Sequence, residues 1–227
     1  GIDAKYKAMI LSLLCFGVSP SVEEVFTDGI SNITKEDFDW AKRLNKTIKL
    51  VAQIDNSMDG FNARVYPVLV DSKHPLAAIR GALNAVLVEG ENINQLVFSG
   101  PGAGSAPTAS AIIGDVFSAC HQMLSSQTNW YPLRTPKSGD KEFKDVQSSW
   151  FIRLSVKDEP GVLATIAGLF GENNVSIESV IQEGRGDNAE LVLVTHEAEE
   201  NNLTSSIESI SKLSSVSSVT STIRVYI

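Results

Sequence analysis

The end of the chain, Ser149–Ile227, carries the sequence pattern that most restricts the fold. Segments of strand length alternate with two helical patterns in the order strand, helix, strand, strand, helix, strand. This order predicts a ferredoxin-like βαββαβ domain, built from two βαβ halves with right-handed crossovers. The expected elements are strand Phe151–Val156, a helix ending at Asn173, strands Val175–Gln182 and Ala189–His196, helix Glu199–Leu213 and strand Val219–Tyr226.

The residues before this pattern predict a mixed α/β layer, in which helices cover a sheet. Alternation predicts a strand over Thr47–Ile54, and turn residues join it to a return strand over Asn62–Val70. Pro67 lies in the return strand and indicates an edge strand or a bulge, because proline has no N–H to donate. Thr34, three residues before Asp37, is typical of the residue that caps a helix start.

The segment 125–148 is polar and interrupted by proline and glycine, which indicates a linker. The fold class is therefore α+β. A mixed α/β sheet domain covered by helices occupies 1–124, the linker occupies 125–148, and the βαββαβ domain occupies 149–227. We expect the large hydrophobic residues of the linker to dock on a domain surface; these are Trp130, Tyr131, Leu133 and Phe143.

The first helix, expected over Asp3–Phe16, is apolar on almost every side, so it is predicted to be central and buried. Only its first turn is polar, and Asp3 and Lys7 share a face there because they are four residues apart. They can form a surface ion pair at a helix start, contributing about 0.3–0.5 kcal/mol. Alternatively, they can clamp a substrate while Lys7 transfers a proton. The spacing alone favours the ion pair.

A glycine-rich stretch, Gly100 to Gly104, lies between an apolar run and a helical pattern from about Pro107. In this layout backbone N–H groups can meet a phosphate or carboxylate. It is not the dinucleotide fingerprint, because Ser105 stands where the third glycine is required. A tight strand-to-helix turn is the favoured interpretation from these residues alone. The candidate binding residues are Gly100, Gly102, Ala103 and Gly104.

A second candidate site is the start of the first helix in the βαββαβ pattern. Pro160 is predicted near the first helical position, and Gly161 permits a close approach of a ligand to the backbone. The free N–H groups of such a helix start could receive the carboxylate of a small amino acid, although a well-capped helix explains the same residues. The candidate residues are Asp158, Glu159, Pro160, Gly161, Val162 and Leu163, with Val175 and Ile177 from the strand that follows.

Charge and residue types narrow the function classes. The net charge of −8 and an isoelectric point near 4.9 disfavour partners that need a basic patch, so neither nucleic acid nor a membrane is expected. The three histidines show no metal-ligand spacing, and no metal site is expected. Cys15 and Cys120 are predicted to be buried thiols of a cytoplasmic protein. The chain begins with glycine directly before a helical pattern, which suggests that its natural start is missing.

Several motifs, taken in order, resemble the homoserine dehydrogenase family, and the last part of the chain resembles an ACT domain. The resemblance covers essentially the whole chain, and its specificity comes from the ordered matches over two domains. The match to the ACT domain is Asp158–Leu163. The matches to the dehydrogenase family are Gly1–Lys7, Asp28-Gly29-Ile30, Ile48–Ala52, His74–Ala77, Asn84-Ala85-Val86, Gly100–Gly104 and Pro107–Ser110.

This resemblance implies an NAD(P)-dependent oxidoreductase that interconverts L-homoserine and L-aspartate 4-semialdehyde. It implies that Lys7 handles the proton at the substrate oxygen, that Asp3 helps to bind substrate, and that Gly100–Gly104 lies beside the nicotinamide. It also implies feedback control through the ACT domain, with L-threonine as the expected effector, and a homo-oligomer, a dimer or tetramer, that buries an apolar sheet face.

The chain departs from the family pattern, because the N-terminal dinucleotide-binding domain is not among its residues. We therefore expect this chain alone to be inactive and to bind NAD(P) weakly or not at all. The alternative hypothesis is a stand-alone amino-acid-sensing ACT protein whose first domain is only a dimerisation scaffold, without catalysis.

Overall fold

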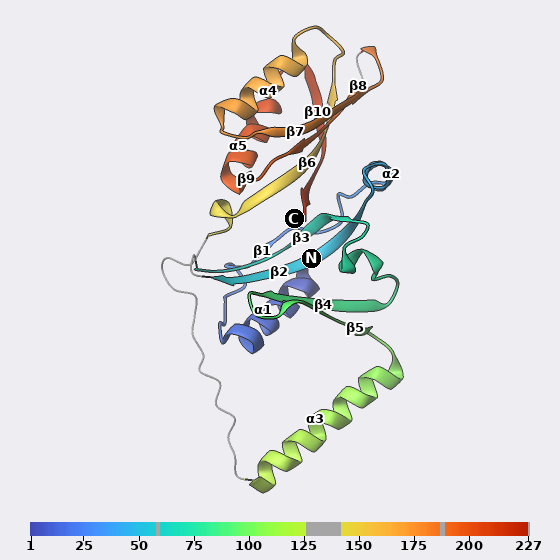
Figure 1. Cartoon of the computed structure of the whole chain (residues 1–227), viewed down its shortest axis with the longest axis vertical. Coiled ribbons are helices and arrows are strands. Elements are labelled where there is room, and N and C mark those ends of the chain that lie inside the picture. The colour runs from blue at the N-terminus through green and yellow to red at the C-terminus, as the bar shows by residue number, and fades with distance from the viewer. Residues whose placement is uncertain (58–59, 126–141, 187–188, 227) are drawn as a thin grey trace. The chain divides into compact units, whose positions relative to one another are not determined.

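The computed structural model describes residues 1–57, 60–125, 142–186 and 189–226 (Figure 1). By their contacts, the described residues of 1–71 and 133–227 form one unit, and those of 72–132 form a second. The contacts thus join the first strands to the βαββαβ part. The limits 1–124, 125–148 and 149–227 remain a prediction about regions of the sequence, and most of the expected linker, with Trp130, Tyr131 and Leu133, lies outside the described residues.

The first unit is built on one sheet that runs through both of its sequence segments. Strand order is β1-β3-β10-β6-β8-β7, with β2 paired to the other side of β3 and β9 paired to β6. The bounds are β1 Phe26–Thr27, β2 Lys46–Ser57, β3 Gly60–Asp71, β6 Gln147–Val156, β7 Ile177–Glu183, β8 Ala189–Thr195, β9 Ala198–Glu199 and β10 Val216–Val225.

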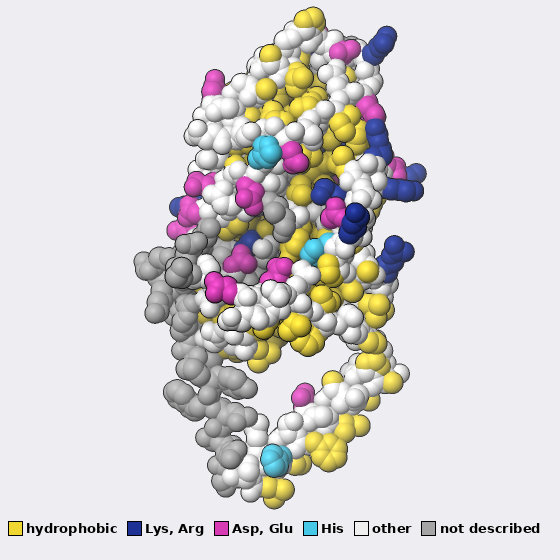
Figure 2. Space-filling model, in the orientation of Figure 1, with side chains coloured by type: hydrophobic (Ala, Val, Ile, Leu, Met, Phe, Trp, Pro, Cys, Tyr) yellow, Lys and Arg dark blue, Asp and Glu magenta, His cyan; other side chains and the backbone are white. Residues whose placement is uncertain are grey.

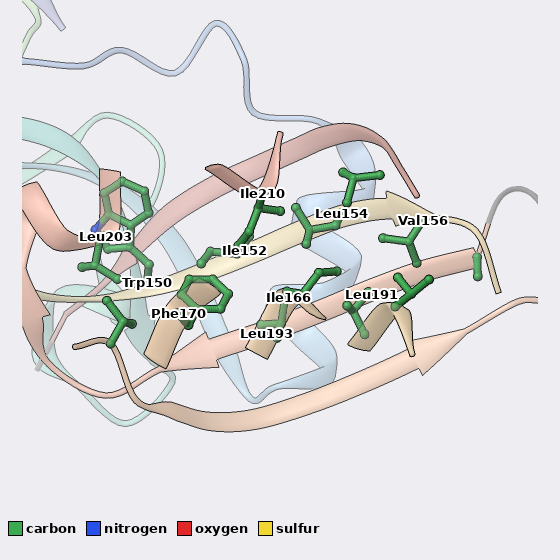
Figure 3. Packing of buried hydrophobic residues seen from close by; sticks show 14 of the residues in the cluster. Trp150, Ile152, Leu154, Val156, Ile166, Phe170, Leu191, Leu193, Leu203 and Ile210 are labelled. Atoms are coloured by element: carbon green, nitrogen blue, oxygen red, sulfur yellow. The ribbon is translucent and has the colours of Figure 1, made fainter. Parts of the chain in front are cut away.

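The expected βαββαβ order is confirmed. Helices α4 (Val162–Glu172) and α5 (Glu200–Ile210) connect β6, β7, β8 and β10, whose order in the sheet is β10-β6-β8-β7. Alternate residues of each strand face the helices, because successive side chains of a strand point to opposite faces. The resulting core is shown in Figure 3 and includes Trp150, Ile152, Leu154, Val156, Ile166, Phe170, Leu191, Leu193, Leu203 and Ile210.

Helix α2 (Lys35–Arg43) covers the opposite face of this sheet. It begins with the predicted cap: Thr34 Oγ1 accepts from the Asp37 N–H, and the Asp37 carboxylate accepts from the Thr34 N–H. Trp40 and Ala41 of α2 pack on the apolar strand residues that point away from α4 and α5. These are Phe151, Val192, Val194 and Ile223. Both faces of the central strands β6 and β8 are therefore buried.

Pro67 lies neither on an edge strand nor at a bulge, so that prediction is wrong. On one side of β3, Pro67 pairs with Leu50 of β2. On the other side, Arg64 and Val65 pair with β1, whereas Val68 and Leu69 pair with β10. Proline fits between the two partners because no ladder bond is needed where one neighbouring strand ends and the next begins.

Helix α1 (Ile2–Phe16) packs on β2 and β3 by one narrow stripe, and the prediction that it is central and buried is wrong. Small residues face the sheet, and of these Ala8 and Ser12 are buried. The large residues face outward, with Ile2, Ile10 and Leu14 all more than half exposed. Gly17 ends the helix as expected, at φ 66°.

The second unit contains a short 3-10 helix, Pro75–Ala78, a hairpin of β4 (Leu83–Gly90) and β5 (Asn94–Pro101), and the long helix α3 (Ser105–Ser125). No residue of α3 is buried. Figure 2 shows hydrophobic side chains along this helix, and Phe117 is 73% exposed. Cys15 and Cys120 are both exposed, which corrects the expectation of buried thiols, because their helices are covered on one side or not at all. Among the described helices, none is both long and apolar enough to cross a membrane.

Candidate functional site

The first turns of α1 bring Asp3 and Lys7 together. Lys7 Nζ lies 2.8 Å from Asp3 Oδ2, and the side chains are 61% and 85% exposed, respectively. Gly1 precedes the helix and supplies no side-chain cap. The acidic group in the first turn is the carboxylate of Asp3. The described residues thus show a solvent-facing ion pair whose ammonium group a small substrate can reach.

The neighbouring Lys5 is held in a different way. Its ammonium group donates to the carbonyl of Val22 at 2.9 Å, which ties the helix to the segment that follows it. Lys5 and Lys7 therefore differ in what they can do: the first fixes the chain, whereas the second carries its charge toward solvent beside a carboxylate.

The glycine stretch lies in the second unit, so it is described separately from Lys7. Gly100 is still part of β5, opposite Asn84, and the Gly102 N–H donates to the carbonyl of Ala82 at 3.1 Å. A Cβ on Gly102 would lie 1.4 Å from Asn84 Nδ2, so the Asn84 side chain would have to move to admit any other residue there. Gly104 has φ 133°, which favours glycine.

This geometry limits what the stretch can bind. The helix begins at Ser105, earlier than the expected Pro107, and Pro107 removes one of the N–H groups of its first turn. A Cβ on Gly100 would meet nothing within 4 Å, so the backbone there is open to a ligand. No Lys or Arg occurs from Asn94 to Ser105 to neutralise a pyrophosphate. The stretch is therefore better suited to contact with a ring that carries no negative charge than to binding of a phosphate.

In the βαββαβ part, the candidate loop lies beside β7. Gly161, at φ 93°, is the residue before α4, and Pro160 precedes it instead of occupying the first helical position. Asp158 to Gly161 are exposed. Asp158 Oδ1 accepts from Gln182 Nε2 of β7 at 2.9 Å, and the Asp158 N–H donates to the carbonyl of Gly186 at 2.8 Å.

The remaining candidates of that loop divide between core and surface. No side chain caps the start of α4, and the Val162 N–H donates to the carbonyl of Glu159 at 3.3 Å, so the N–H groups that a carboxylate could meet are those of Leu163 and Ala164. Val162 and Val175 are buried in the core and Ile177 packs against it, whereas Leu163 is 40% exposed. Glu159 is exposed. Any ligand therefore meets the backbone and the exposed side chains of the loop.

The sequence analysis missed a buried ionic cluster between α2 and the sheet. Arg153 of β6 is only 5% exposed, and its guanidinium lies 3.0 Å from Asp37 Oδ1 and 2.9 Å from Glu190 Oε1. It also donates to Thr34 Oγ1 at 3.2 Å. Trp40 Nε1 donates to Glu190 Oε2 at 2.7 Å. An arginine between two apolar strand residues, Ile152 and Leu154, was the signal available in the sequence.

A second missed cluster surrounds Arg224 of β10. Its guanidinium makes two 2.8 Å bonds to the carboxylate of Glu200, which is 2% exposed. Its Cζ lies 4.7–5.2 Å from four aromatic ring centres, and Asp28 Oδ2 is 3.9 Å from Nη1. The rings belong to Phe26, Tyr66, Phe143 and Trp150. Phe143, from the 3-10 helix Phe143–Asp145, stacks on Phe26 with centres 3.6 Å apart, so it docks as predicted.

A hollow of about 370 Å³ lies next to Asp28 in the same unit. Its lining combines the segment 28–33 with hydroxyl-bearing residues of β10, namely Asp28, Gly29, Asn32, Ile33, Pro67, Val219, Thr220, Ser221 and Thr222. Asp28 and Gly29 belong to one of the motifs on which the family resemblance rests. No group of three or more metal-ligand side chains occurs among the residues that the structure describes.

The comparisons with known proteins agree on one family. The homoserine dehydrogenase family model matches residues 1–117, and the ACT domain model matches residues 150–215. Homoserine dehydrogenases of Mycobacterium tuberculosis and Bacillus subtilis are 37% and 35% identical over 99% of this chain. That of Corynebacterium glutamicum is 35% identical over the same share.

Solved structures show the same relationship. The chain superimposes over its full length on the homoserine dehydrogenase of Thiobacillus denitrificans, with a TM-score of 0.91 and 31% identity, covering 53% of that chain. For the homoserine dehydrogenase of S. aureus at pH 7.0 the TM-score is 0.71 and the identity 25%, with 54% of that chain covered. The chain spans about half the length of the curated relatives it matches, 52–54%.

Proposed function

Because this chain belongs to the homoserine dehydrogenase family, we propose that it forms the C-terminal half of an enzyme that interconverts L-homoserine and L-aspartate 4-semialdehyde, in threonine, methionine and isoleucine biosynthesis. The observation that carries the proposal is the Asp3–Lys7 pair on α1, inside the family-matched region. It supplies a carboxylate and an ammonium group 2.8 Å apart on one helix face, both open to a substrate.

In this proposal Lys7 and Asp3 have separate tasks. When homoserine is oxidised, its hydroxyl must lose a proton as its carbon loses a hydride. We propose that Lys7 Nζ, as the neutral amine, takes up that proton as a general base, and that Asp3 helps to hold the polar substrate and to orient the lysine side chain. The bound NAD(P) supplies the acceptor for the hydride. In the reverse direction Lys7 returns the proton to the aldehyde oxygen.

The glycine stretch is proposed to contact the nicotinamide end of the cofactor. Its residues, Gly100, Gly102, Ala103 and Gly104, fit a flat ring without negative charge because the backbone at Gly100 is open and no cation lies nearby in sequence. They do not fit the pyrophosphate, since Pro107 shortens the row of free N–H groups. Pyrophosphate binding therefore falls to residues outside this chain, and the chain alone is expected to bind NAD(P) weakly or not at all.

The ACT domain is proposed to bind an amino-acid effector, with L-threonine as the first candidate. The effector carboxylate would meet the uncapped start of α4 at Gly161, and the exposed loop from Asp158 to Leu163 would contact its side chain.

The proposed location of the whole protein is the cytoplasm.

The proposal includes a homo-oligomer. Helix α3 and the β4–β5 hairpin expose large apolar side chains, such as Phe98 at 62% and Phe117 at 73%. Contiguous apolar surface of this kind marks an interface. We propose that a second copy covers the hairpin and that a dinucleotide-binding domain covers α3.

The test compares this chain with a longer protein in which a family dinucleotide-binding domain precedes Gly1. Homoserine-dependent reduction of NAD(P) is measured, together with fluorescence titration by NADPH. The longer protein is expected to be active and to bind NADPH, whereas the 227-residue chain does neither. An inactive longer protein that still binds an amino acid would favour the sensing alternative, and micromolar NADPH binding by the short chain would contradict the proposed division of the cofactor site.

A further inference from the structure

Two adjacent residues of β7 connect the proposed effector loop to helix α2. Gln182 points to the helix side of the sheet, where its amide donates to Asp158 Oδ1 at 2.9 Å. Glu183 points to the opposite face, because successive strand residues alternate. There its carboxylate receives two bonds from Arg43, one of them 2.9 Å from Nη1 to Oε2. One strand end is thus held from both faces.

The outer face of the sheet needs α2 for electrostatic reasons. Glu183 of β7 is the register partner of Glu190 of β8, and like charges directly opposite each other destabilise a sheet. Arg43 neutralises the first carboxylate and Arg153 the second. Trp40, over whose ring the Arg43 guanidinium lies at 3.8 Å, also donates to Glu190. The position of α2 and the position of the β7–β8 edge therefore depend on each other.

The other end of α2 leads directly to the dehydrogenase motif. Thr34, which caps the helix, is bonded to Arg153 and follows the segment 28–33 that lines the hollow beside Asp28. A shift of α2 along the sheet would pull on this segment through Thr34. Asp37 is fully buried against Arg153, so the start of the helix cannot move without disturbing the ionic cluster.

We infer that an amino acid bound at the Asp158–Leu163 loop acts on the dehydrogenase part through β7 and α2, by way of the Asp158–Gln182 bond on one face and the Glu183–Arg43 pair on the other. The inference rests on the effector site of the proposed function. Coupling of this kind is reciprocal. If the bound effector changes the equilibrium constant for loosening α2 by some factor, then loosening α2 changes the affinity for the effector by that same factor.

The first test needs no ligand. Hydrogen exchange is followed by mass spectrometry in the wild-type chain, in Arg43→Gln and in the matched control Lys144→Gln, which removes an exposed pair with Glu142. Arg43→Gln is expected to speed exchange in 35–43 and also in 158–165, by about two- to fivefold, the range of an exposed ion pair. The control leaves both segments unchanged. Faster exchange in 35–43 with an unchanged loop would overturn the inference.

The second test adds L-threonine, and then other amino acids, in calorimetry and in the same exchange experiment. Glu183→Gln is expected to change the dissociation constant of L-threonine about two- to fivefold. The charge-swapped variant, Arg43→Glu with Glu183→Arg, is expected to move this dissociation constant back toward the wild-type value. Bound threonine should alter exchange in 35–43.

The possible failures are distinguishable. If no amino acid binds the wild-type chain, the effector proposal fails, and the ligand-free experiment still decides whether α2 and the loop are linked. If threonine binds wild type and both variants equally, without altering exchange in 35–43, the route through β7 is wrong although the effector site stands.

Discussion

Replacing Glu200 by glutamine tests whether the buried Arg224 cluster holds β10 in place. Glu200 is 2% exposed, and its carboxylate accepts two 2.8 Å bonds from Arg224 and one 3.2 Å bond from Trp150 Nε1. The substitution keeps the shape of the side chain and removes its charge, so the guanidinium is left buried without its close partner.

The expected loss follows from these contacts. Breaking a buried ion pair by removing one partner costs about 3–5 kcal/mol. Four aromatic rings 4.7–5.2 Å from the guanidinium, and Asp28 at 3.9 Å, retain part of the stabilisation. The lower end, about 3 kcal/mol, is therefore expected, which corresponds to a fall in Tm of about 6–12 °C for a chain of this size.

The assay is urea unfolding followed by circular dichroism, with thermal unfolding in parallel. Glu142→Gln serves as the control, because Glu142 pairs with Lys144 at the surface and its loss should cost less than about 1 kcal/mol. The combined Glu200→Leu and Arg224→Met variant should recover part of the loss, since neither partner of this pair then carries a buried charge. A Glu200→Gln protein within about 0.5 kcal/mol of wild type would refute the role given to this cluster.

Three further predictions concern local geometry. Gly102→Ala should destabilise the second unit by less than about 1 kcal/mol, because the exposed Asn84 side chain can rotate away from the added Cβ, and Gly100→Ala, with nothing within 4 Å, should be nearly neutral; a loss above about 2 kcal/mol for Gly102→Ala in chemical unfolding would contradict this. The hydrogen bond from Arg43 lowers the pKa of Glu183, so the contribution of this pair to stability is present above the ordinary carboxyl pKa and is lost as the pH falls through the lowered one. Because amide exchange itself slows in acid, rates are compared as protection factors: the protection of 35–43 should fall on acidification to about pH 3, and Glu183→Gln should remove the part of that fall that depends on Arg43. Thr34→Ala should cost about 1 kcal/mol by removing the cap of α2, and unchanged stability would show that the cap is dispensable.

The sequence predicted the elements whose signals are local. Periodicity located the βαββαβ order, the hairpins and the first helix, and the Thr34 and Gly17 signals marked the ends of two helices correctly. These features depend on neighbours a few residues apart. Pro67 was misinterpreted because its acceptability depends on where β1 ends and β10 begins, which is a property of strands far away in the sequence.

The candidate site was predictable in part for the same reason. Asp3 and Lys7 meet because four residues make about one helical turn, and Asp158 and Gly161 lie on the predicted loop. Arg153 and Arg224 could be suspected, as charges within apolar strands, but their partners Asp37 and Glu200 come from other elements. The exposure of α1 and α3 was not predictable, because apolar periodicity shows which face is buried without showing what covers it.

The most direct test of the account is the role of Lys7 in the longer protein that contains a dinucleotide-binding domain. Lys7→Gln is compared with Lys5→Gln, whose lysine bonds to the carbonyl of Val22, by measuring kcat and KM for L-homoserine oxidation. Loss of a positioned general acid or base predicts a fall in kcat of about 10²–10⁴ for Lys7→Gln, with a modest effect of Lys5→Gln. A Lys7→Gln enzyme with kcat within about threefold of wild type would contradict the assignment of proton transfer to Lys7.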